Sequence, residues 1–226
     1  VLDMTGGTGN VGLGSGSLGT AITTGTDNVA IGENALDAVT TGSDNTVVGD
    51  NAATALTTGS FNTAIGSGAL ITQTTAGYNT AVGYLSLTAN TTGNANVGLG
   101  ESTLAANTTG SNNTALGYNV LAANTTASNN TAVGRNALDA NTTGADNTAV
   151  GRMALSANTT ASENTAVGQG SLEANTTGAD NTAVGHAALG SNTTSSNNTA
   201  IGRGALYAAT TQGNLTAMGY SALAAN

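Results

Sequence analysis

The sequence has 226 residues, of which 33 are Gly, while Pro, Cys and Trp are absent. Its net charge of −9, with three Arg and no Lys, argues against binding to a nucleic-acid phosphate backbone, which needs clustered basic residues. The absence of Cys excludes disulfides and thiolate chemistry, and no apolar run approaches the roughly 18 residues of a membrane span.

Residues 1–9 precede a repeat, and we interpret this lead-in as the end of a preceding unit. Residues 10–226 form a single array that stops inside a unit. Its recurring motif is Asn130-Thr131-Ala132-Val133-Gly134, which returns with small changes every 17 residues in both directions. Thirteen such starts are present, and one extra residue enters only in the first unit, near Gly19. A period held this long indicates a repeat architecture.

We number the unit 1 to 17 from its first residue, which is Asn in most copies. Position 2 is Thr or Val, position 4 is Val, Ile, Leu or Met, and position 5 is always Gly. This pattern predicts a short strand that ends at a structural corner, as at Gly134, Gly151, Gly168 and Gly185. A second extended segment is expected over positions 8 to 14, followed by a turn. The chain is therefore predicted to be an all-β, parallel β-solenoid of about thirteen coils, which stack about 4.8 Å apart.

Side chains of the first strand alternate between two faces. Thr at position 2 and Val at position 4 share one face, whereas Asn, Ala and Gly at positions 1, 3 and 5 share the other. Neither face ever carries a charge, which predicts that one face fills the coil and the other packs against a second chain. We assign the small Ala132, Ala149 and Ala166 to that contact between chains. The core ladder is then predicted to comprise Val133, Val150, Val167, Val184, Leu138, Leu155, Leu172 and Leu189.

Fourteen of the fifteen charged residues occupy positions 6, 10 and 17 of the unit, which are therefore expected to face solvent. The acids Asp146, Glu163 and Asp180 at position 17 fall in three consecutive coils. Such a column of carboxylates is a candidate Ca²⁺ site, because Ca²⁺ takes several oxygen ligands. The alternative is a solvated acidic stripe that keeps the protein soluble. No other metal or cofactor is expected.

Two patterns typical of enzymes have simpler interpretations. His186, the single His, lies at the exposed position 6, and a general base needs a fixed partner and a pocket. Residues 14–19 match G-x-G-x-x-G, but no helix is expected to follow and the first Gly is the corner of the repeat. The sequence therefore predicts no enzymatic activity.

The Thr-Thr pair at positions 13 and 14 predicts a ladder between coils, represented by Thr142, Thr143, Thr159 and Thr160. Regular Thr columns also occur on ice-binding solenoids, but adjacent Thr side chains point to opposite faces. Seven Asn-Thr-Thr sequences match the acceptor motif for N-glycosylation. The alternative is that these Asn residues form amide ladders between coils. They are Asn90, Asn107, Asn124, Asn141, Asn158, Asn175 and Asn192.

Units such as Asn147-Thr148-Ala149-Val150-Gly151 resemble the head repeats of YadA-type trimeric autotransporter adhesins. The Ala-Asn-Thr-Thr-Gly link between strands resembles repeats of tail-fibre proteins that end in an endosialidase-type chaperone domain. The resemblance covers essentially the whole chain and implies a left-handed parallel β-roll with three chains per fibre. The unit is longer than the YadA head unit, and its strand is Thr-Ala-Val where that family more often has an apolar residue, Ala and Ile.

The sequence thus predicts a structural or adhesive extracellular fibre segment, belonging to a cell surface or a virion. Its expected partner is itself, as a homo-trimer or a head-to-tail filament, with a cell-surface receptor or glycan as a further partner. The competing class is a ligand-binding solenoid, for ice, glycan or Ca²⁺.

Overall fold

The computed structural model describes residues 2–3 and 8–225, in two compact units, Val1–Asn112 and Asn113–Asn226. Within these described residues each unit consists of short strands joined by turns, without helices. Unit 1 contains β1 (Leu2–Asp3), β2 (Val11–Leu13), β3 (Val29–Ile31), β4 (Thr46–Val48), β5 (Thr63–Ile65), β6 (Thr80–Val82) and β7 (Val97–Leu99). Unit 2 contains β8 (Thr114–Leu116), β9 (Thr131–Val133), β10 (Thr148–Val150), β11 (Thr165–Val167), β12 (Thr182–Val184), β13 (Thr199–Ile201) and β14 (Thr216–Met218).

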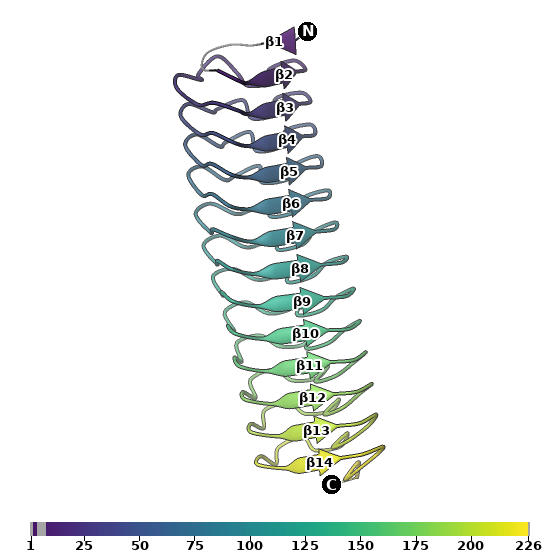
Figure 1. Ribbon diagram of the computed structural model, residues 1–226. Coiled ribbons are helices and arrows are strands. Elements are labelled where there is room, and N and C mark those ends of the chain that lie inside the picture. Colours follow the sequence, from purple (N-terminus) through teal and green to yellow (C-terminus); the bar gives the residue numbers. More distant parts are fainter. Residues whose placement is uncertain (1, 4–7, 226) are drawn as a thin grey trace. The chain divides into compact units, whose positions relative to one another are not determined.

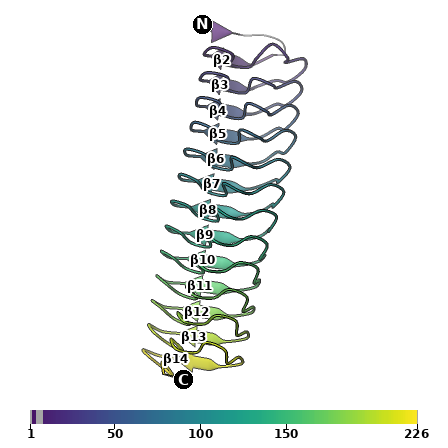
Figure 2. The same ribbon diagram turned by 180° about the vertical axis from the view of Figure 1, so that it is seen from behind.

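In both units successive strands from β2 onward pair in parallel, and equivalent positions of the repeat lie side by side. Thr148 of β10 pairs with Thr165 of β11, which is the 17-residue period seen as register. The pairing of Val11 with Val29 spans one residue more, because the first coil contains the extra residue. Within each unit the strands form one stack, which Figure 2 shows from behind (Figures 1 and 2). The predicted parallel β-solenoid is confirmed.

The lead-in contributes one short strand, β1, to the edge of the sheet of unit 1. β1 runs antiparallel to β2, with Leu2 opposite Leu13 and Asp3 opposite Gly12, whereas the strands from β2 to β7 pair in parallel, each with the next. Part of the lead-in, residues 4–7, lies outside the described residues. The antiparallel pairing gives the backbone groups of β2 a partner on the side away from β3.

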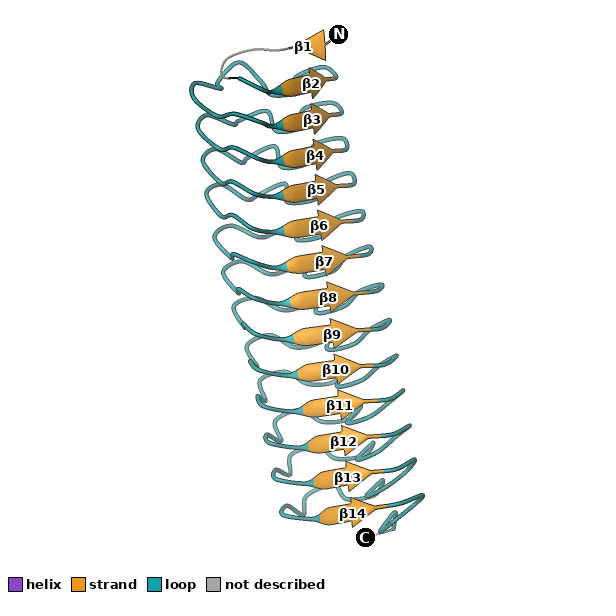
Figure 3. Ribbon diagram, viewed as in Figure 1, coloured by secondary structure: helices purple, strands orange, loops and turns teal. Residues whose placement is uncertain are grey.

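The prediction of a second extended segment over positions 8 to 14 is wrong. Each coil contains one strand, and the rest of the coil consists of turns and loops (Figure 3). The reason lies in the backbone, which has positive φ at alternate residues after the strand. In the coil that starts at Asn147, Gly151, Met153 and Leu155 have φ of 141°, 58° and 52°. This alternation curls the chain into consecutive turns. Backbone hydrogen bonds still connect the coils there, for example Leu155 N–H to Ser171 O at 3.0 Å.

Leu at position 9 combines an unfavourable backbone with a favourable side chain. A left-handed conformation costs a non-Gly residue about 1–2 kcal/mol, and Leu155 adopts it at φ 52°. Its side chain is fully buried, which contributes about 1.5–3 kcal/mol. Burial therefore offsets the strain, and the predicted Leu members of the core ladder, Leu138, Leu155, Leu172 and Leu189, are confirmed as buried.

The prediction that Val at position 4 belongs to the core ladder is wrong. Val133, Val150, Val167 and Val184 are only half-buried, on the outer side of the strands. Ala at position 3 fills the coil instead: Ala132, Ala149 and Ala166 are fully buried inside it and do not lie at a contact between chains. The physical reason is the width of the coil. One strand faces a layer of tight turns, so the central inward position holds a small side chain. The largest one there, Val47, is also fully buried, in the coil where Ala53 replaces the usual Leu at position 9.

Two internal columns of Asn replace much of an apolar core. At position 1, the Asn147 N–H donates to Asn130 Oδ1 at 3.0 Å, and the Asn147 Nδ2 donates to the Ala161 carbonyl at 2.9 Å. At position 12, Asn158 Nδ2 donates to Asn141 Oδ1 at 2.9 Å and to the Ala161 carbonyl at 3.0 Å. These amides satisfy the turn carbonyls and each other, which offsets the cost of burying them.

The glycine corners are confirmed. Gly134, Gly151, Gly168 and Gly185 have φ between 119° and 141°, a region that disfavours side chains. A Cβ on Gly151 would also lie 2.5 Å from the carbonyl oxygen of Gly168 in the next coil. Both the backbone conformation and the close stacking therefore require glycine at position 5.

Candidate functional site: the outer strand face

The outer strand face consists of the position-2 and position-4 side chains of the strands in each unit, such as Thr148 and Val150. The inner side of the strand is filled by Ala, so alternation along the strand turns these residues outward. Large aliphatic side chains are exposed at position 4 in both units. They include Leu13 at 45%, Leu99 at 43%, Leu116 at 41% and Met218 at 71% exposure.

The outer strand face is regular and uncharged. In-register pairing aligns Thr with Thr and aliphatic with aliphatic in successive strands, as Thr148–Thr165 and Val150–Val167 illustrate. Within each unit this makes two columns, about 4.8 Å per step. An apolar column that recurs in every coil is typical of a surface that packs against another molecule, because isolated soluble domains keep contiguous apolar patches small.

Two columns of variable residues flank the outer strand face. Position 6 follows the glycine corner and is exposed at all its charged members, namely Glu33, Asp50, Glu101, Arg135, Arg152 and Arg203, and at His186. Position 17 precedes the strand, and its acids are exposed as well. Charged residues at position 10, namely Asp37, Asp139 and Glu173, are half-buried. The expectation of solvent exposure is therefore confirmed for positions 6 and 17 and holds only partly for position 10.

The frequent Asn and Asp at position 17 have a conformational explanation that the sequence pattern did not reveal. This position adopts positive φ in both units, for example 58° at Asp44 and 62° at Asn197. Asn and Asp tolerate this region better than other side chains, which accounts for their frequency at position 17 without a ligand. Phe61 and Tyr78 occupy the same position in unit 1 and stack with ring centroids 5.0 Å apart.

The candidate Ca²⁺ residues lie close enough to influence one another. Asp180 raises the pKa of the Glu163 carboxyl, through a side-chain hydrogen bond and then charge repulsion, and Asp146 adds a smaller repulsion. The acids remain exposed, however. Within residues 2–3 and 8–225 no group of three or more acidic or His side chains has a geometry that could hold a metal ion.

The prediction of glycosylation at the seven Asn-Thr-Thr sequences is wrong for the folded chain. Asn90, Asn107, Asn124, Asn141, Asn158, Asn175 and Asn192 are all fully buried. The Nδ2 atom that would carry a glycan donates instead to the carbonyl of position 15, as Asn141 does to Gly144 at 2.9 Å. The alternative explanation, an amide ladder between coils, is confirmed.

The Thr ladder is confirmed for position 13. Thr142 Oγ1 donates to the Thr159 carbonyl at 2.9 Å, and Thr159 Oγ1 donates to the Thr176 carbonyl at 3.2 Å. At position 14, Thr143 and Thr160 carry exposed side chains, while the Thr143 backbone N–H donates to Thr159 O at 3.3 Å. The position-13 hydroxyls are therefore occupied inside the protein.

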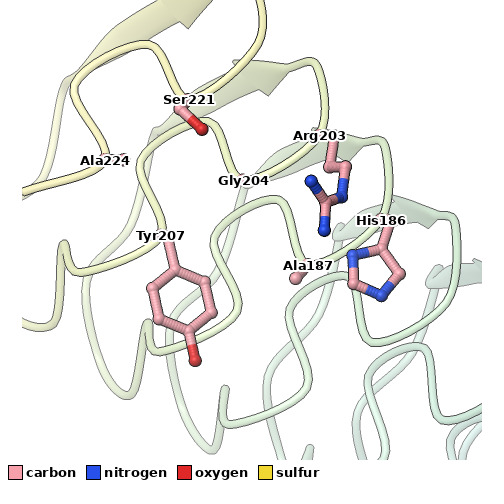
Figure 4. Close-up of a pocket in the computed structure, with 7 residues that line it drawn as sticks. All are labelled: His186, Ala187, Arg203, Gly204, Tyr207, Ser221 and Ala224. Atoms are coloured by element: carbon pink, nitrogen blue, oxygen red, sulfur yellow. The ribbon is translucent and has the colours of Figure 1, made fainter.

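Unit 2 also carries a groove of about 300 Å³ beside the position-6 column (Figure 4). Tyr207 lies on one side, His186 and Arg203 lie on the other, and Ala187 and Gly204 lie between them. Arg203 Nη1 donates to Tyr220 Oη at 3.2 Å. The groove exists because position 7 is small in these coils. Sequence reasoning missed it, although the run of small residues at position 7 was a visible signal.

Neither protein-family models, nor curated proteins, nor solved structures include a match to this chain. The described residues also contain no helix able to cross a lipid bilayer.

Proposed function

We propose that this chain is a structural segment of an extracellular fibre or adhesive head, and that it self-associates through the outer strand face. The observation that carries the proposal is the uncharged face of Thr and aliphatic columns that recurs in both units. The stacked backbone hydrogen bonds and internal amide ladders supply mechanical stiffness without a large apolar core. The resemblance to YadA-type heads and tail-fibre repeats supports the same role and implies three chains.

The outer strand face, rather than the Ala column, is the contact in this proposal. Val150→Lys with Val167→Lys places two charges on that face, so the oligomer should dissociate into smaller species in sedimentation experiments. Thr143→Lys with Thr160→Lys is the matched control, because position 14 is exposed and lies outside the outer strand face. A wild-type chain that stays monomeric at all concentrations would contradict the proposal, and so would an unchanged mass of the Val variant.

The groove beside Tyr207 favours a second candidate, a ligand-binding solenoid. An aromatic ring opposite Arg203 and His186 suits an acidic glycan, because the ring stacks on a sugar face and the Arg203 guanidinium attracts a carboxylate. Titration with an acidic oligosaccharide tests this candidate. Binding that Tyr207→Ala abolishes would support it, and binding equally strong to both proteins, or to neither, would contradict it.

A further inference from the structure

A second hollow, of about 520 Å³, adjoins the groove of Figure 4. The two share three lining residues, His186, Ala187 and Tyr207. We call the new one the Glu173 hollow and the first the Arg203 hollow, after the charged residue that lines each. Since the shared residues belong to both, the two hollows form one elongated groove within unit 2.

The floor of this groove consists of small residues at position 7. Gly170, Ala187 and Gly204 occupy this position in three successive coils, and Met153 ends the run in the coil before them. The space above Gly204 is open, because a Cβ there would meet only Ser221 Oγ, at 3.6 Å. A pyranose ring is comparable in length to one coil step of about 4.8 Å, so the floor has room for about three sugars.

The Tyr207 ring is held at the junction of the two hollows. A Cβ on Gly190 would lie 3.0 Å from Tyr207 Cε2, so the ring fills the space that a side chain at position 10 of the preceding coil would need. Gly190 is the single Gly at position 10 of unit 2. The ring lines both hollows and remains 49% exposed. A large aromatic side chain that is already held in place binds a ligand at a low cost in conformational entropy.

The two ends of the groove differ in charge. Arg203 Nη1 donates to Tyr220 Oη at 3.2 Å, and its guanidinium carbon lies 5.7 Å from the centre of the Tyr220 ring. No carboxylate of the described residues pairs with Arg203, so its other N–H groups are available to a ligand carboxylate. At the other end the Glu173 carboxylate lies over Gly170, where a Cβ would be 2.7 Å from Oε2. That carboxylate accepts hydrogen bonds from hydroxyl groups and repels a second carboxylate.

We propose that this groove binds a short linear glycan with a single carboxylate, whose acidic sugar lies beside Arg203 and whose neutral sugars lie in the Glu173 hollow. The inference rests on the second candidate of the proposed function, the ligand-binding solenoid, and adds the order and direction of the sugars. A glycan with a carboxylate on every sugar does not fit, because Arg203 is the single cation of the lining and the net charge of the protein is −9. The groove lies outside the outer strand face, so binding and self-association are separate properties.

Calorimetric titration of the full chain with three trisaccharides tests the proposal. The probes are glucuronosyl-xylobiose with one carboxylate, xylotriose with none and trigalacturonate with three. Glucuronosyl-xylobiose should bind most tightly. Xylotriose should bind about tenfold more weakly, because it lacks the charge-assisted hydrogen bond to Arg203. Trigalacturonate should also bind more weakly, because one of its carboxylates meets Glu173.

Two charge variants with matched controls test the direction of the glycan. Arg203→Gln should remove the preference for glucuronosyl-xylobiose over xylotriose, whereas Arg135→Gln, at another exposed position 6 of unit 2, should leave it unchanged. Glu173→Gln should strengthen the binding of trigalacturonate by about tenfold and have little effect on glucuronosyl-xylobiose. Asp139→Asn, at another half-buried position 10 of unit 2, should change neither affinity.

A third variant tests the position of the ring. Gly190→Ala keeps Tyr207 but places a methyl group against it, so it should weaken the binding of glucuronosyl-xylobiose. Unchanged binding would overturn the assigned role of the ring. Circular dichroism verifies that each variant keeps the fold.

Each outcome of the titrations decides for or against the proposal. The preference for glucuronosyl-xylobiose, its loss in Arg203→Gln and the gain of trigalacturonate binding in Glu173→Gln together support it. Equal binding of xylotriose overturns it, and so does tightest binding of trigalacturonate. A Glu-Gly-Gly peptide that binds more tightly than the glycans would also overturn it, in favour of a peptide ligand. Absence of binding to every probe overturns both this inference and the ligand-binding candidate, while sedimentation tests the fibre separately.

Discussion

The two units have the same coil but fill its interior differently. At position 12, the first three coils of unit 1 bury Ile22, Val39 and Leu56. Unit 2 buries Asn at this position in five successive coils, linked by side-chain hydrogen bonds such as Asn175 Nδ2 to Asn158 Oδ1 at 3.1 Å. Either a pure apolar contact or a self-paired amide satisfies the burial requirement. The backbone coil therefore tolerates two kinds of core, and unit 1 contains both, because its later coils bury Gln73, Asn90 and Asn107 at position 12.

Unit 1 also shows that interior volume can move between positions. Ala53 replaces the usual Leu at position 9, and Leu56 in the same coil is fully buried at position 12. The larger side chain enters the same interior from a different turn. What the coil conserves is a filled volume, as expected for close-packed interiors.

The largest expected effect follows from this exchange of volume. Leu155→Ala in unit 2 and Leu56→Ala in unit 1 should each lower the free energy of unfolding by about 2–5 kcal/mol, because each leaves a cavity. Urea unfolding of the full chain, followed by circular dichroism, measures both. A much smaller loss for Leu56→Ala would show that position 12 does not substitute for position 9.

A change of core type within one unit should have the next largest effect. Asn158→Leu removes the donor to Asn141 Oδ1 and the acceptor of Asn175 Nδ2, so we expect a loss of about 1–3 kcal/mol. The matched change in unit 1, Leu56→Asn, should cost a similar amount. Conversion of all five amides of unit 2 to Leu should cost less per residue, since amides that pair with one another are then removed together. Equal cost per residue would contradict the idea of a continuous ladder.

At position 17 the units differ on the surface rather than inside. Unit 1 stacks Phe61 on Tyr78, and Phe61→Ala should cost about 0.5–1.5 kcal/mol, since Ala keeps the same positive φ and loses only the ring contact. A double-mutant cycle with Tyr78→Ala isolates the coupling between the rings. Additive losses would show that the rings do not stabilise each other.

The smallest effect concerns the acids at position 17 of unit 2. Neighbouring Asp180 raises the pKa of Glu163, so the folded chain binds a proton there more tightly than the unfolded chain does. Stability should therefore fall as pH rises from the ordinary glutamate range through the raised pKa. Glu163→Gln should flatten this part of the pH profile, and thermal unfolding across that range measures it. An unchanged slope in the variant would mean that another group is responsible.

The sequence by itself determined the period, the parallel register, the strand at positions 2 to 4, the glycine corner and the burial of Leu at position 9. These follow from local chemistry: β-branched residues favour strands, and only glycine accepts the corner conformation next to a stacked carbonyl. Their repetition every 17 residues made the signals unambiguous. The exposed charges at positions 6 and 17 were predictable for the same reason, since a charge without a partner is excluded from an interior.

Only the tertiary structure decided which side of the strand faces inward. Alternation along the strand divides Ala from Thr and Val but does not say which set is inside. The width of the coil decides this, and it depends on the turns opposite, where positive φ alternates along Gly151, Met153 and Leu155. Leu gives no local signal for that conformation, because burial inside the finished coil is what offsets its strain. The tertiary structure thus placed Ala inside, buried the Asn-Thr-Thr amides and exposed the Val column as the outer strand face.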